Sequence, residues 1–200
     1  MCNQIHLLFW TIVALLVLRP ENASADAPAE SYVRAQHGEL TSLLAQPKNS
    51  SRDQKIVAIM DRVFDYDDLA RRSLGDDWTT RSQSERDEFK GLLEQLIRQS
   101  YRKQLDKTNG WEISYGASTN VDGGVRVPTT AKHKTDKRKE PVSIDYLMHE
   151  TKGQWRVYDV VIEGSSMVGN YQSQFRKIIR KKGFGELIAR MKRRLAKGSD

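Results

Sequence analysis

Apolar residues in the first half of the chain, after residue 30, recur every three or four positions, the spacing of amphipathic helices. After a short leader at residues 26–30, this pattern predicts a first helix that ends before Pro47. A second helix is expected from the capping box formed by Ser51 and Gln54, and a short third helix should stop at Gly75. The apolar stripes of the first two helices are Tyr32, Val33, Leu40, Leu43, Leu44, Ile56, Val57, Met60, Val63 and Phe64.

A long amphipathic helix of about seven turns follows. Ser82 and Glu85 form a capping box at its start, and Asn109-Gly110 marks its end. Its apolar residues keep the helical spacing throughout: Phe89, Leu92, Leu93, Leu96, Ile97 and Tyr101.

Beyond Gly110 the apolar period changes from 3.6 to 2, which predicts strands. Turn residues at Gly123-Gly124 and at residues 152–154 separate the segments, so four consecutive antiparallel strands are expected. The segment Lys132 to Glu140 is too charged to be buried and is interpreted as a hairpin tip. The alternating residues are Trp111, Ile113, Tyr115, Val125, Val127, Thr129, Val142, Ile144, Tyr146, Met148, Trp155, Val157 and Val161.

Helical spacing returns after residue 166 and is interrupted at Gly183, which predicts two C-terminal helices. Helices, then a strand meander, then helices describe an α+β fold: a four-stranded, twisted antiparallel sheet packed by N- and C-terminal helices. The C-terminal helices hold most of the excess basic residues. Basic residues stabilise the C-terminal ends of helices, and these could also bind phosphate headgroups or an acidic partner. Exposed, solvated helix faces explain them equally well.

The N-terminus predicts export. Leu7 to Leu18 form an apolar run too short to cross a bilayer as a helix, and Ala23-Ser24-Ala25 supplies the small-residue pattern of signal peptidase sites. We therefore expect residues 1–25 to be a cleaved signal peptide and residues 26–200 to form a single exported domain. Cleavage removes the only cysteine, so the mature chain can form neither a disulfide nor a thiolate metal site.

A net charge of +7 could indicate nucleic-acid binding, but export removes that partner. The positive charge then indicates binding to an anionic membrane surface or to an acidic protein. A basic surface that only aids solubility is an equally good explanation.

Candidate catalytic residues are few. His37, His133 and His149 lack the spacing of metal ligands, and a GxSxG motif is absent. Asp145 and Asp159 lie on strands expected to be neighbours and could support proton transfer together with Tyr146. Alternatively both are solvated, or Asp159 is a buried, hydrogen-bonded anchor between Val157 and Val161.

The segment DVVIEGSSMVGNYQSQF at residues 159–175 closely resembles a signature of the MlaC family, also known as toluene-tolerance auxiliary proteins. Matching positions are Asp159, Val160, Ile162, Glu163, Gly164, Ser166, Val168, Asn170, Tyr171, Gln174 and Phe175. A second similar block runs from Phe64-Asp65-Tyr66 to Trp78, and Ser84-Glu85-Arg86 resembles the start of the family's long helix. Gln172, Ser165 and the basic hairpin depart from the family pattern.

The resemblance implies an NTF2-like cone with a deep apolar pocket, in a periplasmic carrier whose cargo is phospholipid and which needs no cofactor. It also implies two partners: an outer-membrane lipoprotein complex and an inner-membrane ABC transporter with an MCE-domain subunit. A related branch is associated with hopanoid production and remains an alternative. The residues expected to bind lipid are Phe89, Leu92, Leu93, Leu96, Tyr101, Val125, Val127, Ile144, Tyr146, Met148 and Val157.

Two rival functions remain open. One is an enzyme of the ketosteroid-isomerase shape that uses Asp145 or Asp159 with Tyr146. The other is a structural adaptor held to anionic membranes by its basic C-terminal helices, which charge reversal at Arg190, Arg193 and Arg194 should inactivate.

Overall fold

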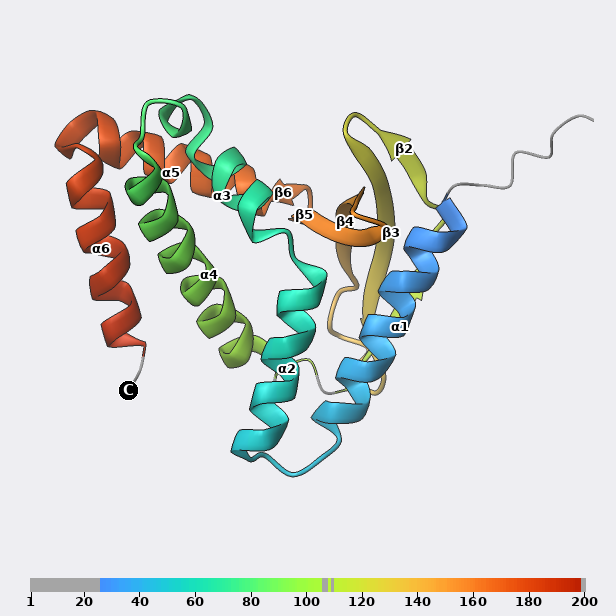
Figure 1. Ribbon diagram of the computed structural model, residues 1–200. Helices are drawn as coiled ribbons and strands as arrows, with labels where there is room; N and C mark the ends of the chain where they lie inside the picture. The colour runs from blue at the N-terminus through green and yellow to red at the C-terminus, as the bar shows by residue number, and fades with distance from the viewer. Residues whose placement is uncertain (1–25, 106–107, 109, 199–200) are drawn as a thin grey trace, which may run out of the picture.

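The computed structural model describes residues 26–105, 108 and 110–198 (Figure 1). The predicted signal peptide, residues 1–25, lies outside this range. The described helices are α1 (Asp26–Leu44), α2 (Ser50–Val63), α3 (Tyr66–Leu74), a 3₁₀ turn η1 (Gly75–Trp78), α4 (Gln83–Leu105), α5 (Met167–Lys182) and α6 (Phe184–Lys197). The described strands are β1 (Trp111–Tyr115), β2 (Thr119–Val121), β3 (Gly124–His133), β4 (Val142–Thr151), β5 (Gln154–Ile162) and β6 (Ser165–Ser166).

The helix boundaries confirm most of the expected caps. Ser82 and Glu85 form the predicted capping box, with the Ser82 N–H donating to Glu85 Oε2 at 2.8 Å. Gly75 ends α3 with φ of +58°. Two expectations were wrong: residues 26–30 belong to α1, and α2 is capped by Asn49, whose side chain accepts from Arg52 N at 2.9 Å.

The sheet is antiparallel with strand order β1-β3-β4-β5-β6, and β2 pairs with the start of β3. The α+β class and the four predicted strands are confirmed. The sheet has more strands than the four expected, because β2 and β6 also belong to it. β2 and β6 have three and two residues, so neither is long enough to show a two-residue apolar period. The charged hairpin connection between β3 and β4 is present, but it spans residues 134–141, because Lys132 and His133 still pair with β1 as the end of β3.

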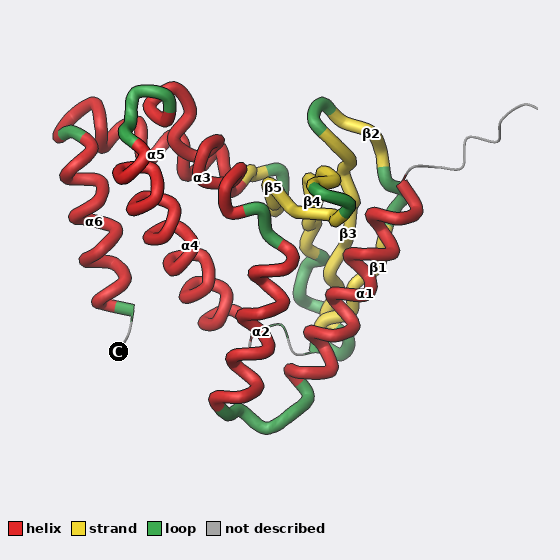
Figure 2. The backbone as a smooth tube through the Cα atoms, viewed as in Figure 1, coloured by secondary structure: helices red, strands yellow, loops and turns green. Residues whose placement is uncertain are grey.

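Two layers of secondary structure face each other. Figure 2 shows α4, α5 and α6 gathered on one side and the strands on the other, with α2 between them and α1 crossing the sheet. The main core joins the sheet to α3, α4, α5 and α6, with Phe89, Leu93, Met148 and Val157 almost fully buried. A smaller cluster of Leu43, Ile56, Ile59 and Leu105 joins α1, α2 and the end of α4. Over the described part of the chain, no helix is long and apolar enough to span a bilayer.

Candidate functional site

An apolar pocket lies between the sheet and three helices, where α1 and α2 meet the C-terminal end of α4. Its cavity is about 80 Å³ in volume. The lining consists of Tyr32, Val33, Gln36, His37, Leu40, Ile59, Met60, Val63, Phe64, Tyr101, Leu105, Tyr146 and Val157. We call these thirteen residues the apolar pocket.

Both ring nitrogens of His37, a pocket residue, are paired with tyrosine hydroxyls. His37 Nδ1 lies 2.8 Å from the Tyr115 hydroxyl, and His37 Nε2 lies 3.0 Å from the Tyr146 hydroxyl. Burial lowers the pKa of His37 to about 4, so the ring is neutral at pH 7, with one nitrogen donating and the other accepting. Burial likewise raises the pKa of Tyr101 to about 12 and that of Tyr146 well above its ordinary value. The pocket therefore presents a wall that carries no charge at neutral pH, which suits hydrocarbon.

Polar contacts close the seam between α1 and α2 beside the pocket residues Tyr32 and Gln36. The Arg62 guanidinium on α2 donates to Gln36 Oε1 and pairs with Glu39 on α1. The Tyr32 hydroxyl donates to the Arg62 carbonyl at 3.2 Å. These contacts are partly exposed to water, where such ion pairs contribute little, so the seam can separate at low cost.

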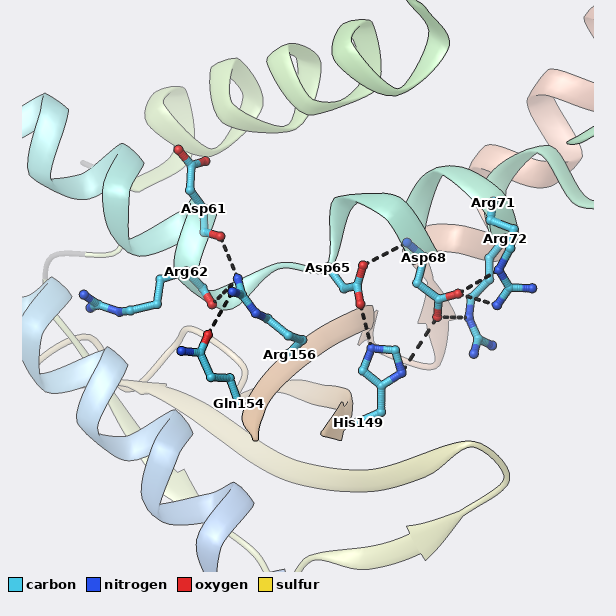
Figure 3. Close-up of polar contacts among 9 residues, drawn as sticks. All are labelled: Asp61, Arg62, Asp65, Asp68, Arg71, Arg72, His149, Gln154 and Arg156. Atoms are coloured by element: carbon cyan, nitrogen blue, oxygen red, sulfur yellow. Dashed lines mark hydrogen bonds and ion pairs between the residues drawn. The ribbon is translucent and has the colours of Figure 1, made fainter. Parts of the chain in front are cut away.

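A second set of contacts ties the α2–α3 junction to the sheet (Figure 3). Arg156 on β5 donates from Nη1 to the carbonyl oxygens of Asp61 and Arg62, at 2.8 and 2.7 Å, and so satisfies the C-terminal end of α2. The backbone N–H of Asp65 donates to the Val157 carbonyl at 2.9 Å. The chain between the two helices is thereby held against β5 through its backbone.

The same junction is fixed to β4 by side chains. Asp65 accepts from Asp68 N at 2.9 Å as the N-cap of α3, and its other oxygen lies 2.8 Å from His149 Nε2. Burial opposes ionisation of Asp68, but the guanidiniums of Arg72 and Arg71 outweigh it and hold the pKa of this carboxyl below its ordinary value. Figure 3 shows these side chains converging between α3 and the strands. We call the contacts of Asp61, Arg62, Asp65, Asp68, His149 and Arg156 the anchoring cluster.

Three of the eleven residues expected to bind lipid line the apolar pocket: Tyr101, Tyr146 and Val157. Six others are buried in the main core: Phe89, Leu92, Leu93, Val125, Val127 and Met148. Ile144 packs partly buried against that core, and Leu96 borders a groove between α4, α5 and α6. Contact of any of the eleven with lipid stays a prediction.

The sequence interpretation did not assign α1 and α2 to the pocket, although they supply most of its wall. Their apolar stripes were recognised as helix faces, but a stripe does not reveal which neighbour it meets. The spacing of His37 argued against a metal site and indicated no other role for this residue. The signal that could have placed it is its position on α1 between Val33 and Leu40, within one turn of both apolar residues.

The two candidate carboxylates serve other purposes. Asp159 is buried and accepts from the N–H groups of Val160 and Val168 at 2.8 and 3.0 Å, and from the Ser166 hydroxyl, so it anchors the start of α5. Asp145 lies next to Tyr146 on β4 and therefore points to the opposite face of the sheet, where Arg126 Nη1 is 3.7 Å away. Neither carboxylate pairs with Tyr146 in the manner that the isomerase hypothesis needs. Among the described residues no group of three or more His, Cys, Asp and Glu side chains is arranged to hold a metal ion.

Together these features define a class of α+β protein in which helices cover one face of a curved sheet and enclose an apolar pocket. The sequence matches the family described as MlaC protein over residues 35–193, and the chain belongs to this family. Its fold is similar to that of the phospholipid-binding protein from Ralstonia solanacearum, solved in complex with a phospholipid, with a TM-score of 0.74. That similarity covers 86% of this chain and 99% of the other at 20% sequence identity, and it shows a shared fold.

Proposed function

We propose that this protein is a periplasmic phospholipid carrier that holds acyl chains in the apolar pocket. The observation that supports this most directly is the uncharged wall of the pocket, in which the polar atoms of His37 and Tyr146 are paired with each other. Membership of the MlaC family and the shared fold with a phospholipid-binding protein support the same function.

The cargo explains why a carrier is needed. Two acyl chains of about sixteen carbons expose roughly thirty methylenes, whose transfer from water is worth about 25 kcal/mol in total. Free diffusion of such a lipid through an aqueous compartment is therefore negligible. The carrier must offer nearly the same burial as a bilayer, so that loading and unloading stay close to reversible.

The pocket has to widen before it can hold a lipid. Its volume of about 80 Å³ is well below the roughly 300–1,000 Å³ of pockets that enclose drug-sized ligands. We propose that the sheet with α1 moves away from α2 and α4, with the anchoring cluster as the fixed end. The exposed Arg62 contacts to Gln36 and Glu39 break in this motion, whereas the contacts of Arg156 and Asp65 persist.

The proposed route runs between an outer-membrane lipoprotein complex and an inner-membrane ABC transporter that carries an MCE-domain subunit. The sequence holds no GxxxxGK[ST] motif for ATP, so the direction of net transport comes from the partners. A signal peptide cleaved before Asp26 delivers the protein to this compartment.

Lipid analysis of the mature protein tests the proposal. We expect phospholipid to copurify with protein expressed with its own leader, as seen by native mass spectrometry and by organic extraction. Delipidated protein should regain phospholipid from vesicles. Protein that is empty on purification and takes up no lipid from vesicles contradicts the proposed function, and a bound hopanoid in place of phospholipid assigns the chain to the alternative branch.

A further inference from the structure

The β3–β4 connection forms an exposed basic tip on the sheet. Its four Lys and Arg side chains are solvent-exposed, as is Lys132 near the end of β3, and the connection also holds two acidic residues, Asp136 and Glu140. The partly exposed Trp111 of β1 pairs in register with His133 at the base of this tip. We define the basic tip as Trp111 together with Lys132, Lys134, Lys137, Arg138 and Lys139.

The charges of the basic tip are largely uncompensated within the described chain. Arg138 pairs with Asp136 at 3.1 Å, but Lys132, Lys134 and Lys137 have no ion pair with any described residue. Lys139 lies with Nζ 5.8 Å from the centroid of the Trp111 ring. On the C-terminal helices, Arg190 and Arg193 pair with Glu186 and Lys192 pairs with Glu88, whereas Lys177, Arg180 and Lys181 of α5 have no ion pair with a described residue. The basic tip differs from that part of α5 in having a partly exposed tryptophan beside its lysines.

Backbone hydrogen bonds connect the basic tip to the apolar pocket. The N–H of Thr108 donates to the carbonyl of Leu105, a pocket residue at the end of α4, and the N–H of Trp111 donates to the carbonyl of Thr108. The N–H of Lys134 donates to the carbonyl of Gly110 at 2.8 Å. The basic tip therefore lies at the Leu105 end of the pocket, whereas the anchoring cluster lies at its Phe64 and Val157 end. In Figure 1 this connection lies at the end of the sheet close to where α4 finishes.

We propose that the basic tip docks the protein on the surface of an anionic phospholipid bilayer and turns the Leu105 end of the pocket toward it. Flexible, unpaired lysines suit a diffuse layer of lipid phosphates, and each contributes attraction within a Debye length of the surface. A partly exposed tryptophan among them is the side chain that settles best at the membrane–water interface. This pairing of an aromatic ring with lysines favours a bilayer over an acidic protein surface. Only the orientation of the pocket rests on the proposed function, because docking itself requires no lipid uptake.

Vesicle sedimentation of the mature protein tests the inference with a charge-matched control. The test variant carries Lys134→Glu, Lys137→Glu and Lys139→Glu, and the control carries Lys177→Glu, Arg180→Glu and Lys181→Glu on the exposed face of α5. Both variants change the net charge by the same amount. On vesicles of phosphatidylcholine with about one third phosphatidylglycerol, the test variant should bind at least about 50-fold more weakly than wild type, and the control should lose less than about tenfold. Binding of the wild type should fall steeply with salt and be weak on phosphatidylcholine alone.

A second measurement locates the contact. Brominated lipids should quench the tryptophan fluorescence of the wild type and of Trp78→Phe, but quench Trp111→Phe markedly less. A milder variant with Lys134→Gln, Lys137→Gln and Lys139→Gln keeps the test valid if charge reversal perturbs folding. Equal loss of binding in the test and control variants overturns the inference. So does unchanged binding of the test variant, and in that case an acidic protein becomes the better partner for the basic tip. Copurified phospholipid should be unchanged in the test variant, so a failure of docking is distinguishable from a failure of the proposed carrier function.

Discussion

His37 Nε2 on α1 lies 3.0 Å from the hydroxyl of Tyr146 on β4, and this contact joins the N-terminal helix to the centre of the sheet. The opposite ring nitrogen reaches Tyr115 on β1, so one imidazole spans two strands of the sheet. Arg34, one turn earlier on α1, lies with its guanidinium carbon 3.9 Å from the centroid of the Tyr115 ring. α1 is therefore fixed to the sheet by specific polar and aromatic contacts, which is why we expect it to move with the sheet when the pocket opens.

The burial of His37 predicts a loss of stability in mild acid. Its pKa is about 4 in the folded protein and near 6.5 when unfolded, so the unfolded chain binds more protons between these values. The contribution of His37 to the free energy of unfolding should be constant above pH 6.5 and decline by about 3 kcal/mol as the pH falls to 4. Urea unfolding of wild type and His37→Gln at several pH values measures this contribution as the difference between their free energies of unfolding. Glutamine is suitable because it can form hydrogen bonds but does not titrate.

A site-resolved measurement separates His37 from the other histidines. An NMR titration of the ring protons should show one histidine signal with a midpoint near pH 4, and that signal should be missing from His37→Gln. A midpoint near 6.5 for His37, or identical pH dependence of stability in both proteins, contradicts the buried neutral ring.

Asp159 is expected to be a structural residue. Its carboxylate accepts from two backbone N–H groups and from Ser166, which is itself the N-cap of α5. Asp159→Ala leaves these buried donors unpaired and should lower the free energy of unfolding by about 2–4 kcal/mol. Asp145→Ala is the matched control, since Asp145 makes only a partly exposed ion pair with Arg126 and should cost less than about 1 kcal/mol. Equal effects of the two substitutions on urea unfolding would show that the hydrogen bonds of Asp159 are not stabilising.

The sequence predicted those elements whose physical signal is local. Capping side chains and a helical period are set within a few residues, so the Ser82 and Glu85 box and the break at Gly183 were placed correctly. The anchor role of Asp159 could also be anticipated, because the residue stands between apolar neighbours in a strand. β2 and β6 could not be predicted, since strands of three and two residues owe their existence to the partners β3 and β5.

The pocket itself was less predictable because it depends on how faces meet. Phe89 and Leu93 lie on the apolar stripe of α4 and are buried against core residues, whereas Tyr101, two turns further along the helix, faces α1 and α2. Periodicity assigns all three residues to one apolar stripe. It does not show where along the helix the stripe stops packing against the main core and begins to face α1 and α2. The role of α1 follows from the crossing of that helix over β3 and β4, a tertiary relationship that no window of the sequence contains.

Gly124 is expected to tolerate no side chain. It begins β3 with φ of +156°, and a Cβ at this position would lie 1.9 Å from the Met148 carbonyl oxygen of β4. Gly124→Ala must therefore displace the strand pairing and should lower the free energy of unfolding by about 3 kcal/mol or more. Gly123→Ala separates the clash from backbone strain, because Gly123 also has positive φ but meets only the end of Arg72, at 3.7 Å. We expect Gly123→Ala to lower the free energy of unfolding by about 1 kcal/mol. Similar midpoints of thermal unfolding for the two variants would contradict the close approach of the strands.

Filling the apolar pocket should reduce lipid binding without unfolding the protein. Val63 lines the pocket near the α1–α2 seam and is partly exposed, so Val63→Trp can place an indole into the space that acyl chains need. Val57 lies on the same helix and is also partly exposed, but it borders the groove between α2 and α4 and does not line the pocket. Both substitutions should cost about 1–3 kcal/mol of stability, whereas only Val63→Trp should lose most of the copurified phospholipid.

The comparison works because the two variants share the same chemical change on one helix. Phosphate analysis of the extracted lipid, normalised to folded protein by circular dichroism, gives the occupancy of each. If Val63→Trp retains the wild-type lipid content while Val57→Trp loses it, the acyl chains lie in the groove between α2 and α4, and the cavity near His37 is not the carrier site. If neither variant changes the lipid content, the acyl chains do not need the space beside Val63, and this result also contradicts the assignment of the apolar pocket as the carrier site.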